Sequence, residues 1–160
     1  MDTFLAIASR REVREYTDTP LPEDVVRRIL DAGRLSGSSQ NTQKWEFVAL
    51  RDKQAVSEFV YAPGNVLGAQ LVVAIAGDAA PFDVGRAAQN MLLAAWNEGV
   101  GSVPNGIKDR DAAAQLVGAP VGIVLTFGYP AKPRDAEARS AGEWSERAKR
   151  KPFDEVTRTI

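Results

Sequence analysis

Residues 83–102 run DVGRAAQNMLLAAWNEGVGS, and this stretch decides the architecture. Asp83–Glu98 has the pattern of a long helix, and it is continuously apolar from Met91 to Trp96. Gly99 stands where a left-handed C-terminal cap belongs. A helix that is apolar around most of its circumference must be buried on most sides. We therefore expect a central helix or a dimer contact here.

Shorter helices and strands alternate on both sides of this helix, as judged from apolar spacing. The expected helices are Asp2–Ala8, Glu23–Leu35 (opened by Pro22), Lys53–Val60 and Asp109–Leu116. The expected strands are Trp45–Leu50, Leu71–Ala76, Val100–Val103 and Val121–Phe127. Pro63-Gly64-Asn65 is typical of a turn. The pattern predicts one α+β domain over residues 1–160, whose charged tail from residue 131 onward either docks or stays disordered.

The composition excludes several classes of function. Hydrophobic residues make up 44% and charged residues 26%, which is an ordinary globular balance. The net charge of -1 disfavours a general nucleic-acid binder. The chain has 0 Cys and 0 His, so it can form neither a Ser-His-Asp or Cys-His nucleophile nor a common zinc site. We expect no metal, and any redox chemistry must come from a bound cofactor.

The chain shows no sign of export or membrane insertion. Its start lacks the basic region and apolar core of a signal peptide. The longest apolar runs, Leu71–Ala76 and Met91–Trp96, are too short to span a bilayer. A cytoplasmic location without a membrane partner is the expectation.

Three arginines near the start form the first candidate site. Arg10, Arg11 and Arg14 fall within five residues, and the basic run Lys149-Arg150-Lys151 lies far away in sequence. The planar guanidinium donates two parallel hydrogen bonds to a phosphate, so the two groups could hold a phosphate or a ring carbonyl from two sides. The alternative is an exposed charged stretch with weak surface ion pairs.

A polar loop over Ser36–Lys44 is the second candidate. Its Ser, Asn and Gln side chains supply donors and acceptors without net charge. Such a set suits a flat heterocycle with alternating carbonyl and N–H groups, for example the flavin pyrimidine ring. The alternative is an ordinary capped loop, because the same residues dominate turns.

Taken together, four blocks in order resemble the FMN-dependent nitroreductase family. Arg10–Tyr16 is similar to its opening Arg-Arg-Ser-x-Arg-x-Phe signature, and Ser38–Trp45 to its Pro-Ser-Ser-x-Asn-x-Gln-Pro-Trp loop. Asp83–Ser102 resembles the central helix and the glycine-rich strand start after it, and Arg150–Val156 the closing Arg-Lys-Pro-Leu-Glu-Glu-Val. Gly128-Tyr129-Pro130 matches the end of the last central strand.

The resemblance implies a mixed central sheet flanked by helices, and a homodimer with two FMN molecules at its interface. It assigns no catalytic side chain. Residues on the phosphate and pyrimidine side would be Arg10, Arg11, Glu12, Arg14, Lys149 and Arg150. Residues approaching from the partner subunit would be Ser38, Ser39, Asn41 and Gln43. The backbone near flavin N5 would be that of Pro104, Asn105 and Gly106, and Asn65 is a further candidate.

The chain departs from the family pattern at three positions. Glu12 replaces a serine, and we expect it to pair with a neighbouring arginine or to face the pyrimidine edge. Gly37 and Lys44 replace the prolines that flank the polar loop. Gly37 should loosen the loop, and Lys44 is either solvated or attracts an anionic substrate.

The resemblance implies a ping-pong cycle in which NADH or NADPH reduces flavin N5 and a nitroaromatic, quinone or similar acceptor then takes the electrons. Arg11 or Arg14 would stabilise the anionic reduced flavin. Three alternatives stay open. They are a flavin carrier or sequestering protein, a flavin-fragmenting or reductive-dehalogenating relative (for which we find no lid segment), and a nucleic-acid module with one basic face.

Overall fold

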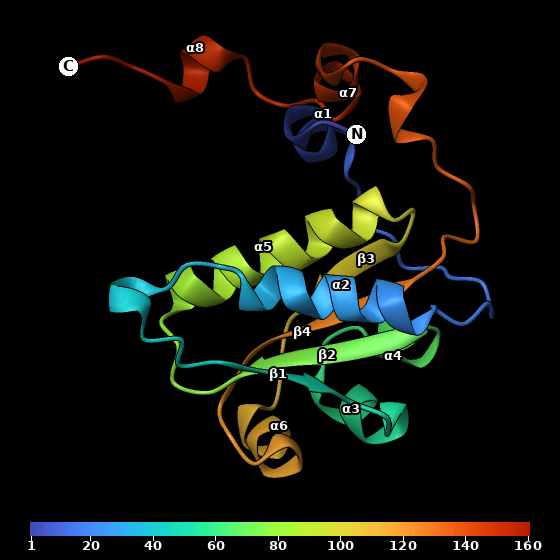
Figure 1. Ribbon diagram of the computed structural model, residues 1–160, viewed down its shortest axis with the longest axis vertical. Helices are drawn as coiled ribbons and strands as arrows, with labels where there is room; N and C mark the ends of the chain where they lie inside the picture. The colour runs from blue at the N-terminus through green and yellow to red at the C-terminus, as the bar shows by residue number, and fades with distance from the viewer. The chain divides into compact units, whose positions relative to one another are not determined.

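A four-stranded antiparallel sheet forms the centre of the larger of two units in the computed structural model, which describes residues 1–160 (Figure 1). This unit spans Arg11–Arg134. The strands are β1 (Glu46–Ala49), β2 (Leu71–Ala76), β3 (Gly101–Asn105) and β4 (Val121–Gly128), in the order β1-β2-β4-β3. The α+β class is confirmed. The expected mixed character of the sheet is confined to one isolated parallel bridge, between Glu12 and Ser102.

Helices cover both faces of this sheet. Figure 1 shows α2 (Glu23–Arg34) and α5 (Pro81–Asn97) above it, and α3 (Lys53–Phe59) and α6 (Arg110–Val117) below it. On β2, Val73 and Ile75 pack in the core cluster that contains α2 and α5, and Val72 and Ala74 in the opposite cluster. Alternate residues of a strand point to opposite faces, so a strand covered on both sides has no polar positions. This explains the continuous apolar run of β2.

The long helix α5 begins with Pro81 at its first helical position and ends at Asn97. Gly99 follows with φ of 72°, which confirms the predicted left-handed cap. The side of α5 that bears Met91 is buried, whereas Phe82, on the other side, is 74% exposed. A single chain therefore buries only one side of α5, and not most of its circumference as expected.

The prediction of a turn at Pro63-Gly64-Asn65 is wrong. These residues begin a short helix, α4 (Pro63–Leu67). Proline is well tolerated at the first helical position, because the N–H that it lacks has no intrahelical partner there. The other predicted helices and strands of this unit occur within about two residues of their expected ends.

The smaller unit combines Met1–Arg10 with Asp135–Ile160. Its helices are α1 (Thr3–Ser9), α7 (Ala141–Arg147) and α8 (Phe153–Val156), with a 3-10 turn over Ala136–Ala138. The Trp144 ring is buried, and its Nε1 donates to the carbonyl of Ala136 over 2.8 Å. The tail is therefore helical in part, while docking of this tail as part of a single 1–160 domain stays a prediction. None of the helices combines the length and the apolar character that spanning a bilayer would need.

Candidate functional site

The arginine-rich segment lies along the outer edge of β3. Its attachment consists of the Glu12–Ser102 bridge and a hydrogen bond of 3.0 Å from the Val13 N–H to the Ser102 carbonyl. The approach is close, because a Cβ added to Gly101 would lie 2.7 Å from the Cβ of Val13. The lack of a side chain at Gly101 therefore lets Arg11–Arg14 reach the sheet.

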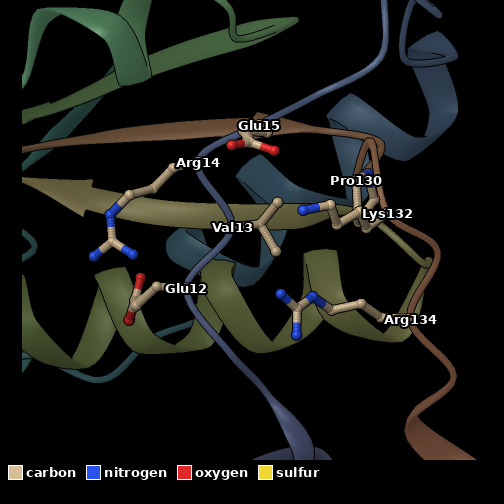
Figure 2. A pocket seen from close by; sticks show the side chains of 7 residues that line it. All are labelled: Glu12, Val13, Arg14, Glu15, Pro130, Lys132 and Arg134. Atoms are coloured by element: carbon tan, nitrogen blue, oxygen red, sulfur yellow. The ribbon is translucent and has the colours of Figure 1, made fainter.

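A cavity of about 280 Å³ opens beside this segment (Figure 2). In Figure 2 the carboxylate of Glu12 and the guanidinium of Arg14 point toward one another, while the role of Glu12 stays a prediction. Three cations and two carboxylates line the cavity together with Val13 and Pro130, and these charged residues are Glu12, Arg14, Glu15, Lys132 and Arg134. The excess of cations suits an anionic ligand.

Sequence reasoning missed Lys132 and Arg134, treating them as part of a charged tail. They lie four and six residues after the end of β4 at Gly128, and the Ala131 N–H donates to the Glu15 carbonyl over 3.0 Å, which holds their segment beside the arginine block. Their position could have indicated a role in the site, because these two cations flank Pro133 shortly after the last predicted strand.

Asn65 and Asn105, both predicted to contact the flavin, are buried and hydrogen-bonded to each other. The Asn65 Nδ2 donates to the Asn105 Oδ1 over 2.9 Å. The Asn105 Nδ2 in turn donates to the carbonyls of Val103 (3.1 Å) and Val124 (3.4 Å) and to the Thr126 hydroxyl (3.2 Å). Two of these partners can only accept, so the orientation of the Asn105 amide is determined. Asn65 consequently uses its donor group and keeps its Oδ1 as an acceptor for other partners.

Tyr16 connects the arginine segment to the same network. Its hydroxyl donates to the Val13 carbonyl over 2.7 Å and lies 3.3 Å from the Thr126 hydroxyl. Burial raises the pKa of Tyr16 to about 12, against a smaller lowering by the hydrogen bond with Thr126. The Tyr16 hydroxyl therefore stays neutral and serves as a structural link.

Pro104 and Gly106 are exposed on either side of the buried Asn105. The structure thus brings Asn65, from α4, to the segment Pro104–Gly106 at the end of β3. Both also lie near the arginine segment, because Tyr16 and Asn105 share Thr126 as a partner.

The polar loop adopts an uncommon backbone conformation. It contains a 3-10 turn over Ser39–Asn41, and Gln40, Asn41 and Gln43 have φ of 51°, 54° and 48°. Residues other than glycine rarely adopt this left-handed region. Ser38 is half-buried and accepts from the Gln43 N–H over 2.9 Å, while Ser39, Asn41 and Gln43 are exposed. The Gln43 Nε2 donates to the Asn41 carbonyl over 3.3 Å, while the exposed side chains of Ser39 and Asn41 can be reached by a ligand.

This loop and the arginine segment lie at opposite ends of α5. The Ser39 N–H donates to Asp83 in the first turn of α5, whereas Glu12 pairs with Ser102, which follows its last turn. A helix of 17 residues is roughly 25 Å long. Figure 1 shows the loop in cyan beyond one end of α5 and the blue arginine segment near the other. One chain does not bring these two predicted parts of the site together.

Arg10, Lys149 and Arg150 belong to the smaller unit. Arg10 follows α1 as its C-terminal cap residue. Lys149 and Arg150 follow α7 and are exposed, and Lys149 has φ of 51°. Their convergence on one phosphate stays a prediction.

A protein-family model described as the nitroreductase family matches residues 7–79 and 65–129. The chain belongs to the nitroreductase family. The predicted family membership is thereby confirmed, and the matched residues include the first three sequence blocks but not Arg150–Val156. Among curated nitroreductase-family relatives, a protein of Archaeoglobus fulgidus provisionally named NADH dehydrogenase/NAD(P)H nitroreductase is 30% identical over 149 residues. The match covers 81% of this chain and 86% of the relative.

Solved structures of nitroreductases have the same fold. A provisionally named nitroreductase of Desulfovibrio desulfuricans, solved in complex with FMN, superposes with a TM-score of 0.81 at 26% identity, over 100% of this chain and 98% of the other. The NADPH:FMN oxidoreductase of Vibrio harveyi, solved with NAD+, has a TM-score of 0.75 at 22% identity, over 84% of this chain and 71% of the other. The latter likeness concerns the fold alone.

Proposed function

We propose that this nitroreductase-family protein is an FMN-dependent NAD(P)H oxidoreductase that reduces a nitroaromatic, quinone or similar acceptor. The observation that carries the proposal is the meeting of Asn65, Pro104–Gly106 and the arginine segment around Thr126. The resemblance assigns all three groups to the flavin, and they come from distant parts of the sequence. The relative of Archaeoglobus fulgidus, whose name includes NAD(P)H nitroreductase, supports the choice of electron donor.

The residues present fit a flavin. Its pyrimidine edge carries both carbonyl oxygens and an N–H, and Asn65 keeps one acceptor while Arg11 and Arg14 supply donors. Gly106 is exposed, so a ring could approach its backbone. The resemblance adds Arg10, Lys149 and Arg150 for the phosphate.

When bound, FMN supplies a group that accepts hydride from NAD(P)H and passes two electrons to the acceptor. For a quinone, the overall change consumes NAD(P)H and a proton and yields NAD(P)+ and the hydroquinone. The chain's own residues orient the cofactor and stabilise negative charge on its reduced form, a role we assign to Arg11 or Arg14. We assign no side chain as acid or base, and solvent supplies protons.

We further propose that the working form is a homodimer. The polar loop and the arginine segment lie at opposite ends of α5 within one chain. If both contact one flavin, as the resemblance implies, the loop must come from a second copy. The exposed side of α5, which carries Phe82 together with the polar residues Arg86, Gln89 and Asn90, would face that copy.

The first experiment is the absorbance spectrum of the purified protein, followed by addition of NADH or NADPH without oxygen. A flavin spectrum that bleaches and recovers with a nitroaromatic or quinone supports the proposal. A flavin that stays oxidised with either nucleotide would favour a carrier protein. Failure to bind added FMN would overturn the assignment of the cofactor.

A further inference from the structure

A buried carboxylate on α5 holds the polar loop. Asp83 is 5% exposed, and its Oδ2 accepts a hydrogen bond of 3.0 Å from the Ser39 N–H. Its Oδ1 lies 3.9 Å from a guanidinium nitrogen of Arg86 one turn further on. A buried carboxylate is strongly unfavourable unless it is paired, so the bond from Ser39 ties the loop firmly to the first turn of α5.

Two hydrogen bonds fasten the start of the loop, one to α5 and one to α2. The Asn90 Nδ2 donates to the Ser36 hydroxyl over 2.7 Å, and that hydroxyl donates to the Ala32 carbonyl over 3.1 Å. Gly37 leaves room for the guanidinium of Arg86, since a Cβ at Gly37 would lie 2.4 Å from its Nη2. Gly37 thus allows this close approach, and the expected loosening of the loop by this glycine stays a prediction.

The part of the loop that is anchored through Ser39 also contains the residues with an unfavourable, left-handed backbone conformation. Gln40, Asn41 and Gln43 all have positive φ, and they lie within four residues after Ser39. Such conformations persist only where the surroundings determine them, and they concentrate at ligand-binding sites. Within the loop, the bond from the Gln43 N–H to the Ser38 hydroxyl closes this strained turn.

We infer that Asp83 is a positioning residue, which holds Ser38–Gln43 in its receptive conformation before the flavin arrives. The inference rests on the proposed function, in which this loop contacts the flavin. A loop already ordered loses less conformational entropy on binding, so its anchor contributes to affinity without touching the ligand.

The test compares FMN dissociation constants, measured by quenching of flavin fluorescence, for full-length Asp83→Ala and Asp83→Asn. Asp83→Ala removes the acceptor and should raise the dissociation constant at least tenfold. Asp83→Asn keeps an oxygen that accepts from Ser39 and should stay within threefold of the wild type. Asp52→Ala is the matched control, because Asp52 accepts from the Ala55 N–H over 2.9 Å at a helix start away from this loop. The affinity of the Asp52→Ala variant for FMN should equal that of the wild type.

Hydrogen exchange of the Ser39 amide in the apoprotein adds a readout that does not depend on the flavin. Ser39 is exposed, but its amide should exchange slowly in the wild type and in Asp83→Asn. Rapid exchange in the wild type would overturn the inference even if Asp83→Ala fails to fold. Wild-type affinity in Asp83→Ala, or equal weakening in both variants, would also overturn it.

Asn41→Ala separates failure of this inference from failure of the proposed site. If Asn41→Ala weakens FMN binding while Asp83→Ala does not, the loop contacts flavin and only the positioning role is wrong. If neither variant affects the affinity of a protein that binds FMN, the contact between loop and flavin is wrong, and the inference falls with it.

Discussion

The side-chain amide of Asn65 donates to the Oδ1 of Asn105 over 2.9 Å and thereby joins α4 to the end of β3. The carbonyls of Val103 and Val124 accept hydrogen bonds from the Asn105 Nδ2, and these bonds fix the orientation of the pair. A polar pair of this kind is buried without cost only if every member is satisfied. It therefore both stabilises the fold and determines which atom Asn65 presents.

Asn105→Asp should lower the free energy of unfolding by about 3 kcal/mol, because a buried carboxylate would face two carbonyl oxygens and could not donate to them. Urea denaturation measures the change. Asn97→Asp, at an exposed position of α5, should change stability by less than about 1 kcal/mol. Similar losses in the two variants would contradict the role of the network.

Gly101→Ala should destabilise the protein by about 1–3 kcal/mol, because the new methyl group would meet Val13 and push the arginine segment from β3. Gly142→Ala, where nothing lies within 4 Å, should instead stabilise α7 by roughly 0.5 kcal/mol. Thermal melts of both variants give the comparison. A melting temperature for Gly101→Ala at or above the wild-type value would show that Val13 does not pack as described.

Tyr16 should make stability fall at high pH. Its pKa is about 12 in the folded state against an ordinary value of 10.0, so the folded state favours the neutral phenol. This contribution is fully present below pH 10 and is lost as the pH rises toward 12. By linkage the loss approaches roughly 2–3 kcal/mol.

Urea midpoints between pH 9 and pH 12 would isolate this effect by comparison of the wild type with Tyr16→Phe. The variant should lose about 1 kcal/mol near neutral pH, with the hydrogen bond to Val13. Its stability should then fall less steeply above pH 10. Parallel curves for the two proteins would refute the assignment.

Arg10→Ala should weaken FMN binding roughly tenfold or more, through loss of charge-assisted hydrogen bonds to the phosphate. Riboflavin, which lacks the phosphate, should bind the variant as it binds the wild type. Fluorescence titration with both flavins measures the difference. Arg28→Ala is the control, because Arg28 is exposed and bonds to Glu98 over 2.8 Å. Equal weakening for FMN and riboflavin would remove Arg10 from the phosphate site.

Local patterns were sufficient for most elements of the larger unit. The apolar run Leu71–Ala76 is β2 with the predicted ends, and Gly99 is the left-handed cap of α5. The cap depends on interactions within a few residues, whereas β2 is marked by a local apolar run although its hydrogen bonds go to the distant strands β1 and β4. The helix at Pro63-Gly64-Asn65 was missed because the same residues favour a turn and the first turn of a helix, and packing of Val66 in the core favours the helix.

The sequence by itself determined the family, the alternation of helices and strands, and the chemical types of the candidate site, since side-chain chemistry and short-range periodicity are local properties. Only the tertiary structure decided which of these residues meet. The bond between Asn65 and Asn105, the cavity between Glu12 and Arg134, and the attachment of Ser39 to Asp83 join residues 40 or more positions apart. Such contacts depend on strand order and helix packing, which arise when the whole chain buries its apolar surface at once.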